Sequence, residues 1–113
     1  MGRKSRDKGQ RGEREAAAEL RRLFGTDARR GRQYQGSDDA PDVISGIHGV
    51  HVEVKRAEQR RLYAAIEQAV ADAGDNIPLV LHRSNGKPWL AIVRLDDLPQ
   101  LAVQLYLTLA EHS

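Results

Sequence analysis

The sequence predicts an α/β fold, a small mixed sheet flanked by helices, and three observations lead to it. Apolar and polar residues alternate strictly over residues 50–55, as they do along a half-buried strand. Apolar residues recur at helical spacing over residues 62–73. Two further apolar runs, 77–81 and 89–93, lie on either side of Asn85-Gly86, which is a strong hairpin signal. Strands and helices that alternate in this way indicate an α/β domain.

Length and composition limit the class of protein. With 113 residues, the chain is expected to form a single compact domain with little core to spare. It has no cysteine, which excludes disulfides and thiolate metal sites. No apolar run approaches membrane-spanning length, and the N-terminus is charged rather than signal-like. A soluble, cytoplasmic protein is therefore expected.

The N-terminal part of the chain is strongly basic. Residues 1–34 carry eleven Lys and Arg against five Asp and Glu, whereas residues 35–113 carry seven against eleven. Residues 1–10 contain few apolar residues, so we expect a flexible segment that can follow a phosphate backbone, ahead of one folded domain over residues 11–113. A tail that only improves solubility is the alternative. The basic residues concerned are Arg3, Lys4, Arg6, Lys8 and Arg11.

A first helix is predicted from about Gly12 to Phe24. Consecutive alanines from Ala16 favour helix formation, and an apolar stripe runs along the same segment. Glu13 lies in the predicted first turn, where a carboxylate interacts favourably with the helix dipole. The stripe consists of Ala16, Leu20, Leu23 and Phe24.

The next elements bring charged residues together. Asp42 begins a short β-branched run, and the glycines after it provide the turn that folds it back onto residues 50–55. In such a hairpin Asp42 lies near Glu53. His51, Glu53 and Lys55 project together from the face opposite the three valines, which are expected to pack in the core. Two carboxylates and an ammonium group then share one small space.

This grouping favours metal-dependent phosphodiester chemistry. Two converging carboxylates raise each other's pKa unless a cation lies between them. Mg²⁺ binds through one or two carboxylates plus water and substrate phosphate, and there it can polarise a phosphoryl oxygen and activate water. Lys55, on the same face, can position that water or neutralise charge on the phosphate. The simpler alternative is a solvated strand face with a cross-strand ion pair and an ordinary polar turn.

Two more elements are expected to border the site. Residues 29–34 should lead to it along an edge strand, where Arg30 or Arg32 can contact phosphate. After Lys55, Arg56 adds positive charge. The helix over residues 62–73 follows and stops at Gly74-Asp75-Asn76, and its Gln68 lies off the apolar stripe, where it can simply face solvent.

The C-terminal part is predicted to be a hairpin and a helix. Pairing outward from Asn85-Gly86 sets His82 near Trp89 and Leu81 near Leu90. Asp96-Asp97 is expected to cap the last helix. The apolar surface of this helix, which includes Val103 and Leu107, is wider than one small core needs. A homodimer interface is therefore our hypothesis.

The sequence also resembles a known nuclease family. Pro41-Asp42, followed after a gap by Glu53-Val54-Lys55, resembles the PD-(D/E)-x-K nuclease signature, and its surroundings resemble archaeal and phage Holliday-junction resolvases. The resemblance covers most of the chain. The hairpin from His82-Arg83 to Pro88-Trp89 most resembles phage-encoded members. The resemblance also rests on Lys8-Gly9, Glu13-Arg14-Glu15, Gly36-Ser37 and Gln68.

The resemblance implies an activity and partners. It implies a restriction-endonuclease-like core and an endonuclease that uses Mg²⁺, with Mn²⁺ able to substitute. The substrate is expected to be a four-way junction or other branched DNA. The protein is expected to act in DNA recombination, as a homodimer of phage or prophage type in the cytoplasm of a bacterial or phage-infected cell.

The resemblance also assigns roles to residues. Asp42, Glu53 and the Val54 carbonyl are expected to bind the metal, Lys55 to act on the water, and Glu13 to support the metal. The residues expected to contact DNA are the basic N-terminal residues with Arg30, Arg32, Ser37 and Arg56, and those expected beside the metal site are His51 and Gln68. The chain departs from the family at Gln33, where these resolvases often have an arginine.

The sequence has three other interpretations. A zinc site at His48, His51 and Glu53 is disfavoured, because His48 is expected in the turn and no second pair of soft ligands is present. A nuclease of the same superfamily with a repair or restriction-like specificity is the second. The third is a DNA-binding module without catalytic activity. Holliday-junction cleavage itself rests on the resemblance, because fold alone does not fix a substrate.

Overall fold

The computed structural model describes residues 2–31, 40–56 and 61–112, and for residues 2–8 the backbone alone. The elements in chain order are α1 (Gly2–Phe24), β1 (Arg29–Arg30), β2 (Val43–Ile44), β3 (Val50–Arg56), α2 (Leu62–Ala73), β4 (Ile77–Arg83), β5 (Leu90–Ile92), the 3₁₀ turn η1 (Leu95–Asp97) and α3 (Leu98–Glu111). The strands in these ranges form one sheet in the order β1-β2-β3-β4-β5. Only the β3–β4 pair among them is parallel, because α2 crosses between the two strands. The predicted α/β class with a small mixed sheet is confirmed.

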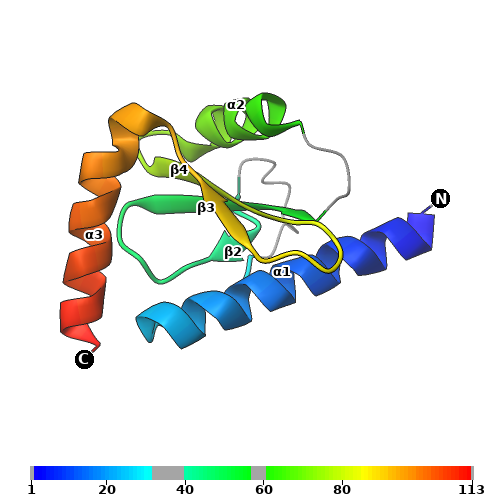
Figure 1. Cartoon of the computed structure of the whole chain (residues 1–113), viewed down its shortest axis with the longest axis horizontal. Coiled ribbons are helices and arrows are strands. Elements are labelled where there is room, and N and C mark those ends of the chain that lie inside the picture. The colour runs from blue at the N-terminus through cyan, green and yellow to red at the C-terminus, as the bar shows by residue number, and fades with distance from the viewer. Residues whose placement is uncertain (1, 32–39, 57–60, 113) are drawn as a thin grey trace.

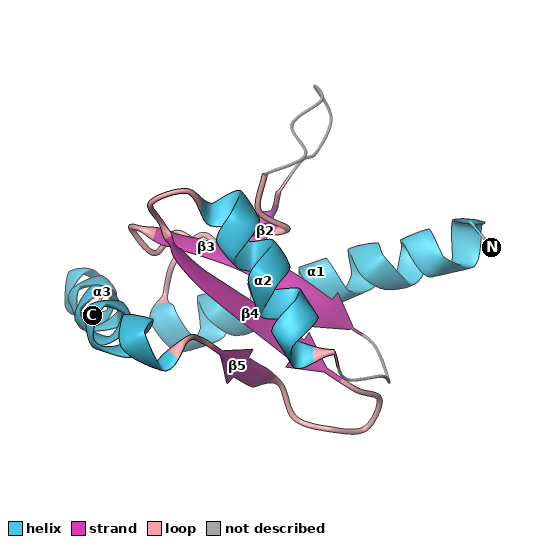
Figure 2. Ribbon diagram, turned by 90° about the horizontal axis from the view of Figure 1, so that it is seen from above, coloured by secondary structure: helices cyan, strands magenta, loops and turns pink. Residues whose placement is uncertain are grey.

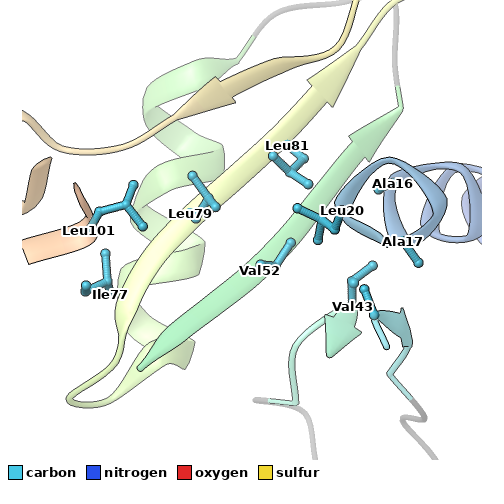
Figure 3. Packing of buried hydrophobic residues seen from close by; sticks show 10 residues of the cluster. Ala16, Ala17, Leu20, Val43, Val52, Ile77, Leu79, Leu81 and Leu101 are labelled. Atoms are coloured by element: carbon cyan, nitrogen blue, oxygen red, sulfur yellow. The ribbon is translucent and has the colours of Figure 1, made fainter. Parts of the chain in front are cut away.

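Helices cover both faces of the sheet. Figure 1 shows α1 along one face and α2 on the other, while α3 stands at the end of the sheet. On the α1 face, Leu20 packs with Val52, Leu79 and Leu101 in the main core, seen in Figure 3. The α2 face has a smaller core of Ala65, Ile66, Ala69 and Val80. In the described part of the chain, no helix has the length and apolar character to span a membrane.

The structure corrects the prediction that β3 is half-buried. Its central residues are buried on both faces, with His51 and Glu53 only 4% and 3% exposed. The reason is the parallel pairing of β3 with β4, which places β3 inside the sheet under α2, as Figure 2 shows. His51, Glu53 and Lys55 do share a face, but a helix covers it.

Helix α1 begins ten residues earlier than predicted, at Gly2 instead of Gly12. The segment expected to precede the helix is therefore part of it. Once the buried Ala16, Ala17 and Leu20 hold the helix against the sheet, each further residue extends it at little cost, and Lys, Arg and Gln are good helix formers. Ala17 belongs to the core, whereas Leu23, predicted to be part of the apolar stripe, is half-exposed.

The first hairpin has the predicted register. Val43 pairs with Val52, so Asp42 lies opposite Glu53. The turn uses Gly46 and Gly49, whose positive φ angles of 78° and 76° suit glycine.

The second hairpin is displaced by one residue from the prediction. A turn forms over Asn85-Gly86 with a hydrogen bond from Lys87 N to Ser84 O, but His82 pairs with Leu90 instead of Trp89, and Leu81 with Ala91. Pro88 explains the displacement, because it has no N–H for the ladder and the pairing resumes beyond it.

The side-chain cap predicted for the N-terminus of α3 does not form. Asp97 occupies the N-cap position but makes no capping hydrogen bond. Its carboxylate instead accepts a hydrogen bond from Arg94 Nε at 2.8 Å. That ion pair fixes the approach of the chain to α3.

Candidate active site

Asp42 is held in place by backbone contacts on both sides. Its N–H donates to Val52 O at 3.0 Å and its carbonyl accepts from Gly31 N at 2.9 Å. Its Oδ2 accepts a hydrogen bond from Val54 N at 2.9 Å. Gly31 permits this approach, because a Cβ there would overlap the carbonyl oxygen of Pro41. The requirement for glycine at this position was not foreseen from the sequence.

Glu53 lies between Asp42 and His51. Its Oε1 is 2.9 Å from His51 Nε2, and its protonated carboxyl donates a hydrogen bond to Asp42. Burial, that hydrogen bond and the negative charges of Asp42 and Asp72 raise the pKa of Glu53 to about 9, while Lys55 lowers it. Without a cation, Glu53 therefore holds a proton that a divalent ion would displace.

Glu13 brings a third carboxylate to this region. Its Oε1 accepts from Arg30 Nε at 2.9 Å. Burial raises the pKa of Glu13, and so does the charge of Asp42, while Arg30 lowers it. Because α1 begins at Gly2, Glu13 is in the middle of the helix, and the predicted interaction with the helix dipole does not apply.

Asp72 is a site residue that sequence reasoning missed. Ligand atoms of His51, Glu53 and Asp72 lie within 4.8 Å of one another. Asp72 comes from α2, four residues after Gln68 and so on the same side of the helix. The four-residue spacing could have identified Asp72 from the sequence, because Gln68 was already expected beside the metal site.

Lys55 is oriented by Gln68. Lys55 Nζ donates a hydrogen bond to Gln68 Oε1 at 3.0 Å. The glutamine is exposed, yet it contacts the lysine instead of solvent alone. The ammonium group, two residues after Glu53 on the same face of β3, is thereby held beside the carboxylates.

Some of the candidate DNA-contacting residues are engaged within the protein, one is exposed, and the side chains of the others lie outside the described part. Arg56 is bound within the protein, with Nε 3.2 Å from Glu15 Oε1 and Nη1 2.8 Å from Asn85 Oδ1. Arg30 pairs with Glu13, and Arg11 is exposed on α1. Arg3, Lys4, Arg6 and Lys8 belong to α1, but their side chains lie outside the described part, as do Arg32 and Ser37 entirely.

The donor set suits a hard divalent cation. Asp42, Glu53 and Asp72 offer carboxylate oxygens, and His51 offers a ring nitrogen. Burial and the negative charges of Asp42 and Asp72 raise the pKa of Glu53. Mg²⁺ and Mn²⁺ prefer oxygen ligands, and such an ion would neutralise those charges. The arrangement of acidic groups beside a lysine can support attack of water on a phosphodiester.

Comparison with known families gives one match. The sequence profile of a family described as archaeal Holliday junction resolvase (Hjc) matches residues 4–105. No curated protein and no solved structure shows a significant match to the chain. The matched range includes α1 from its third residue onward, the whole sheet, α2 and every acidic residue described above.

Proposed function

Because the chain belongs to the archaeal Holliday junction resolvase family, we propose that it cuts DNA four-way junctions with Mg²⁺ as its cofactor. The observation that supports this best is the pair formed by the half-buried Asp42 and the buried Glu53, in which the protonated Glu53 donates a hydrogen bond to Asp42 beside Lys55. Such a pair is unfavourable for folding and has an evident use in binding a cation. We further propose that the protein is of phage or prophage type.

Asp42, Glu53 and the carbonyl of Val54 are the proposed metal ligands. Mg²⁺ is the expected ion, and Mn²⁺ fits the same oxygen donors. When bound, the ion polarises the scissile phosphate and lowers the pKa of water. Binding requires Glu53 to lose its proton, so Mg²⁺ affinity is expected to increase with pH.

The chain's own side chains orient the reactants. Lys55, held by Gln68, directs its ammonium toward the attacking water and offsets charge on the phosphate. His51 positions the Glu53 carboxyl group from one side, and Glu13, paired with Arg30, adds negative charge near Asp42.

DNA binding is proposed to depend on phosphate contacts. Within the proposed single domain over residues 11–113, Arg11 is exposed on α1, and the basic residues of the preceding turns extend the same helix beyond the sheet, as Figure 1 shows. Contacts of this kind recognise shape and backbone instead of sequence, and they weaken steeply with salt.

The direct test uses a synthetic four-way junction and its matching linear duplex, each with Mg²⁺ or EDTA. Paired nicks near the junction centre, in Mg²⁺ alone and on the junction alone, are the expected result. Equal cutting of both substrates would indicate a repair or restriction-like nuclease. Tight binding without cutting in Mg²⁺ or Mn²⁺ would indicate a non-catalytic DNA-binding module.

We also propose that α3 forms a homodimer interface. Val103, Tyr106 and Leu107 are 54%, 70% and 52% exposed and lie along one side of the helix. Their contiguous apolar surface is what a two-fold contact between helices would bury. A dimer would present two active sites to a branched junction.

Tyr106→Glu is expected to weaken this dimer about 100-fold, the effect of losing an interface hot spot. Sedimentation velocity over a micromolar concentration series measures the change. Tyr63→Glu, the same change at an exposed tyrosine of α2, serves as the control and should leave the dimer intact. A wild-type protein that sediments as a monomer at these concentrations would refute the interface.

A further inference from the structure

A cavity of about 320 Å³ lies beside Lys55, between the first turns of α2 and the C-terminal ends of β3 and β4. Figure 2 shows α2 lying across these two strands. Its walls include the apolar side chains of Leu62, Ala64 and Val80. The volume is at the small end of ligand sites, which occupy about 300–1,000 Å³, so it can admit one flat ring system but no duplex.

His82 gives the cavity an unusual polar group. The side chain is 3% exposed, and its Nδ1 lies 3.0 Å from the carbonyl oxygen of Lys55. A carbonyl only accepts, so Nδ1 carries a proton, and in the neutral imidazole with that tautomer Nε2 is an acceptor. Nε2 is buried and has no hydrogen-bond partner among the residues that the structure describes. A buried acceptor without a donor costs about 1–3 kcal/mol, which a ligand with an N–H group would offset.

The other polar groups narrow the chemistry of that ligand. Gln68 and Lys55 line the cavity with an amide and an ammonium group, and Arg61 adds a guanidinium at its edge. An acceptor nitrogen does not suit a phosphate, and none of the described residues that line the cavity is a carboxylate to hold a metal ion. An unpaired nucleobase fits, because it has N–H donors on a flat apolar ring, with an attached phosphate for the cations.

The position of the cavity fits the same ligand. In the β3–β4 register Lys55 pairs with His82, and Glu53 pairs with Val80, so the cavity adjoins the acidic site. A strand whose phosphate lies at Asp42 and Glu53 has its neighbouring base within reach. Base pairs at the crossover of a branched DNA are the easiest to open.

We propose that this cavity receives one unpaired nucleobase next to the cleaved phosphate. The inference rests on the proposed function, because it takes the DNA strand to pass the acidic site. It assigns His82 and Gln68 to base recognition and explains why a shape-selective nuclease would favour a junction over a duplex, whose bases are all paired.

The test uses four-way junctions that carry a single 2-aminopurine within two nucleotides of the crossover, with the wild-type protein in EDTA so that no strand is cut. At one position, 2-aminopurine fluorescence is expected to rise severalfold on binding, as the base leaves its stack. Ala64→Phe, which fills the cavity from an exposed helix position, should abolish the rise and weaken junction binding about tenfold, the loss of one base contact. Ala71→Phe, an exposed position of the same helix outside the cavity, should change neither.

A second measurement does not depend on a variant that folds. The ¹⁵N resonance of His82 Nε2 in the wild-type protein should shift when a deoxynucleoside monophosphate is titrated, because the bare acceptor gains a donor. Absence of both this shift and the fluorescence change would overturn the cavity proposal, whether or not junctions are cut. Base uptake in a protein that cuts no DNA with Mg²⁺ would instead refute the proposed nuclease function and support the cavity as a nucleobase site with no cleaved phosphate beside it.

Discussion

Asp42→Asn is expected to abolish cleavage of a four-way junction, by at least about 10³-fold, while binding of the junction stays the same or tightens. The amide can still accept the hydrogen bond from Val54 N, so the local fold is retained. It cannot act as an anionic ligand, and the metal contributes several kcal/mol to phosphoryl chemistry. Removing a negative charge near the phosphates also reduces repulsion with DNA.

Single-turnover cleavage with Mg²⁺ and fluorescence anisotropy with EDTA measure the two effects separately. Asp75→Asn removes the same charge from an exposed turn after α2 and should cleave like the wild type. Cleavage by Asp42→Asn at the wild-type rate would exclude Asp42 from the metal site. It would favour a DNA-binding module whose carboxylates are structural.

What could be predicted from the sequence was mainly local. The β2–β3 register follows from short-range turn chemistry at Gly46 and Gly49 and from the alternation along β3, so the proximity of Asp42 to Glu53 was predictable. The boundaries of α2 were also predictable, because its apolar spacing and Gly74 define them.

What could not be predicted depends on contacts between distant segments. The burial of His51 and Glu53 requires α2 to cover a face that alternation alone assigns to solvent. Asp72 joins the site only through that covering helix. The displaced β4–β5 register arises because Pro88 has no N–H for the ladder, which overrides the turn signal at Asn85-Gly86.

The environment of Glu53 leads to a second large effect, in which activity and stability change in opposite directions. Glu53→Gln is expected to abolish cleavage, because a neutral amide replaces a metal ligand. The same change should stabilise the metal-free protein above neutral pH. Glutamine can donate a hydrogen bond to Asp42 as the protonated carboxyl does, without ever acquiring a buried charge.

The raised pKa of Glu53 determines whether the free energy of unfolding rises or falls with pH. In the folded protein Glu53 keeps its proton up to about pH 9, whereas in the unfolded chain it loses the proton near its ordinary pKa of 4.5. Between these values the folded state binds more protons, so the free energy of unfolding falls as pH rises, by up to about 1.4 kcal/mol per pH unit. The contribution is fully present below pH 4.5 and is lost toward pH 9.

Urea unfolding in EDTA at pH 5 and at pH 8 tests this directly. The difference in stability between Glu53→Gln and the wild type should be small at pH 5 and clearly in favour of the variant at pH 8. Saturating Mg²⁺ should then stabilise the wild type and not the variant, since only the carboxylate can exchange its proton for the ion. Glu67→Gln, an exposed position on α2, should show none of these effects. A Glu53→Gln protein that is less stable than the wild type by the same amount at both pH values would mean that Glu53 is already ionised in the folded state. That result would refute the hydrogen bond from a protonated Glu53 to Asp42.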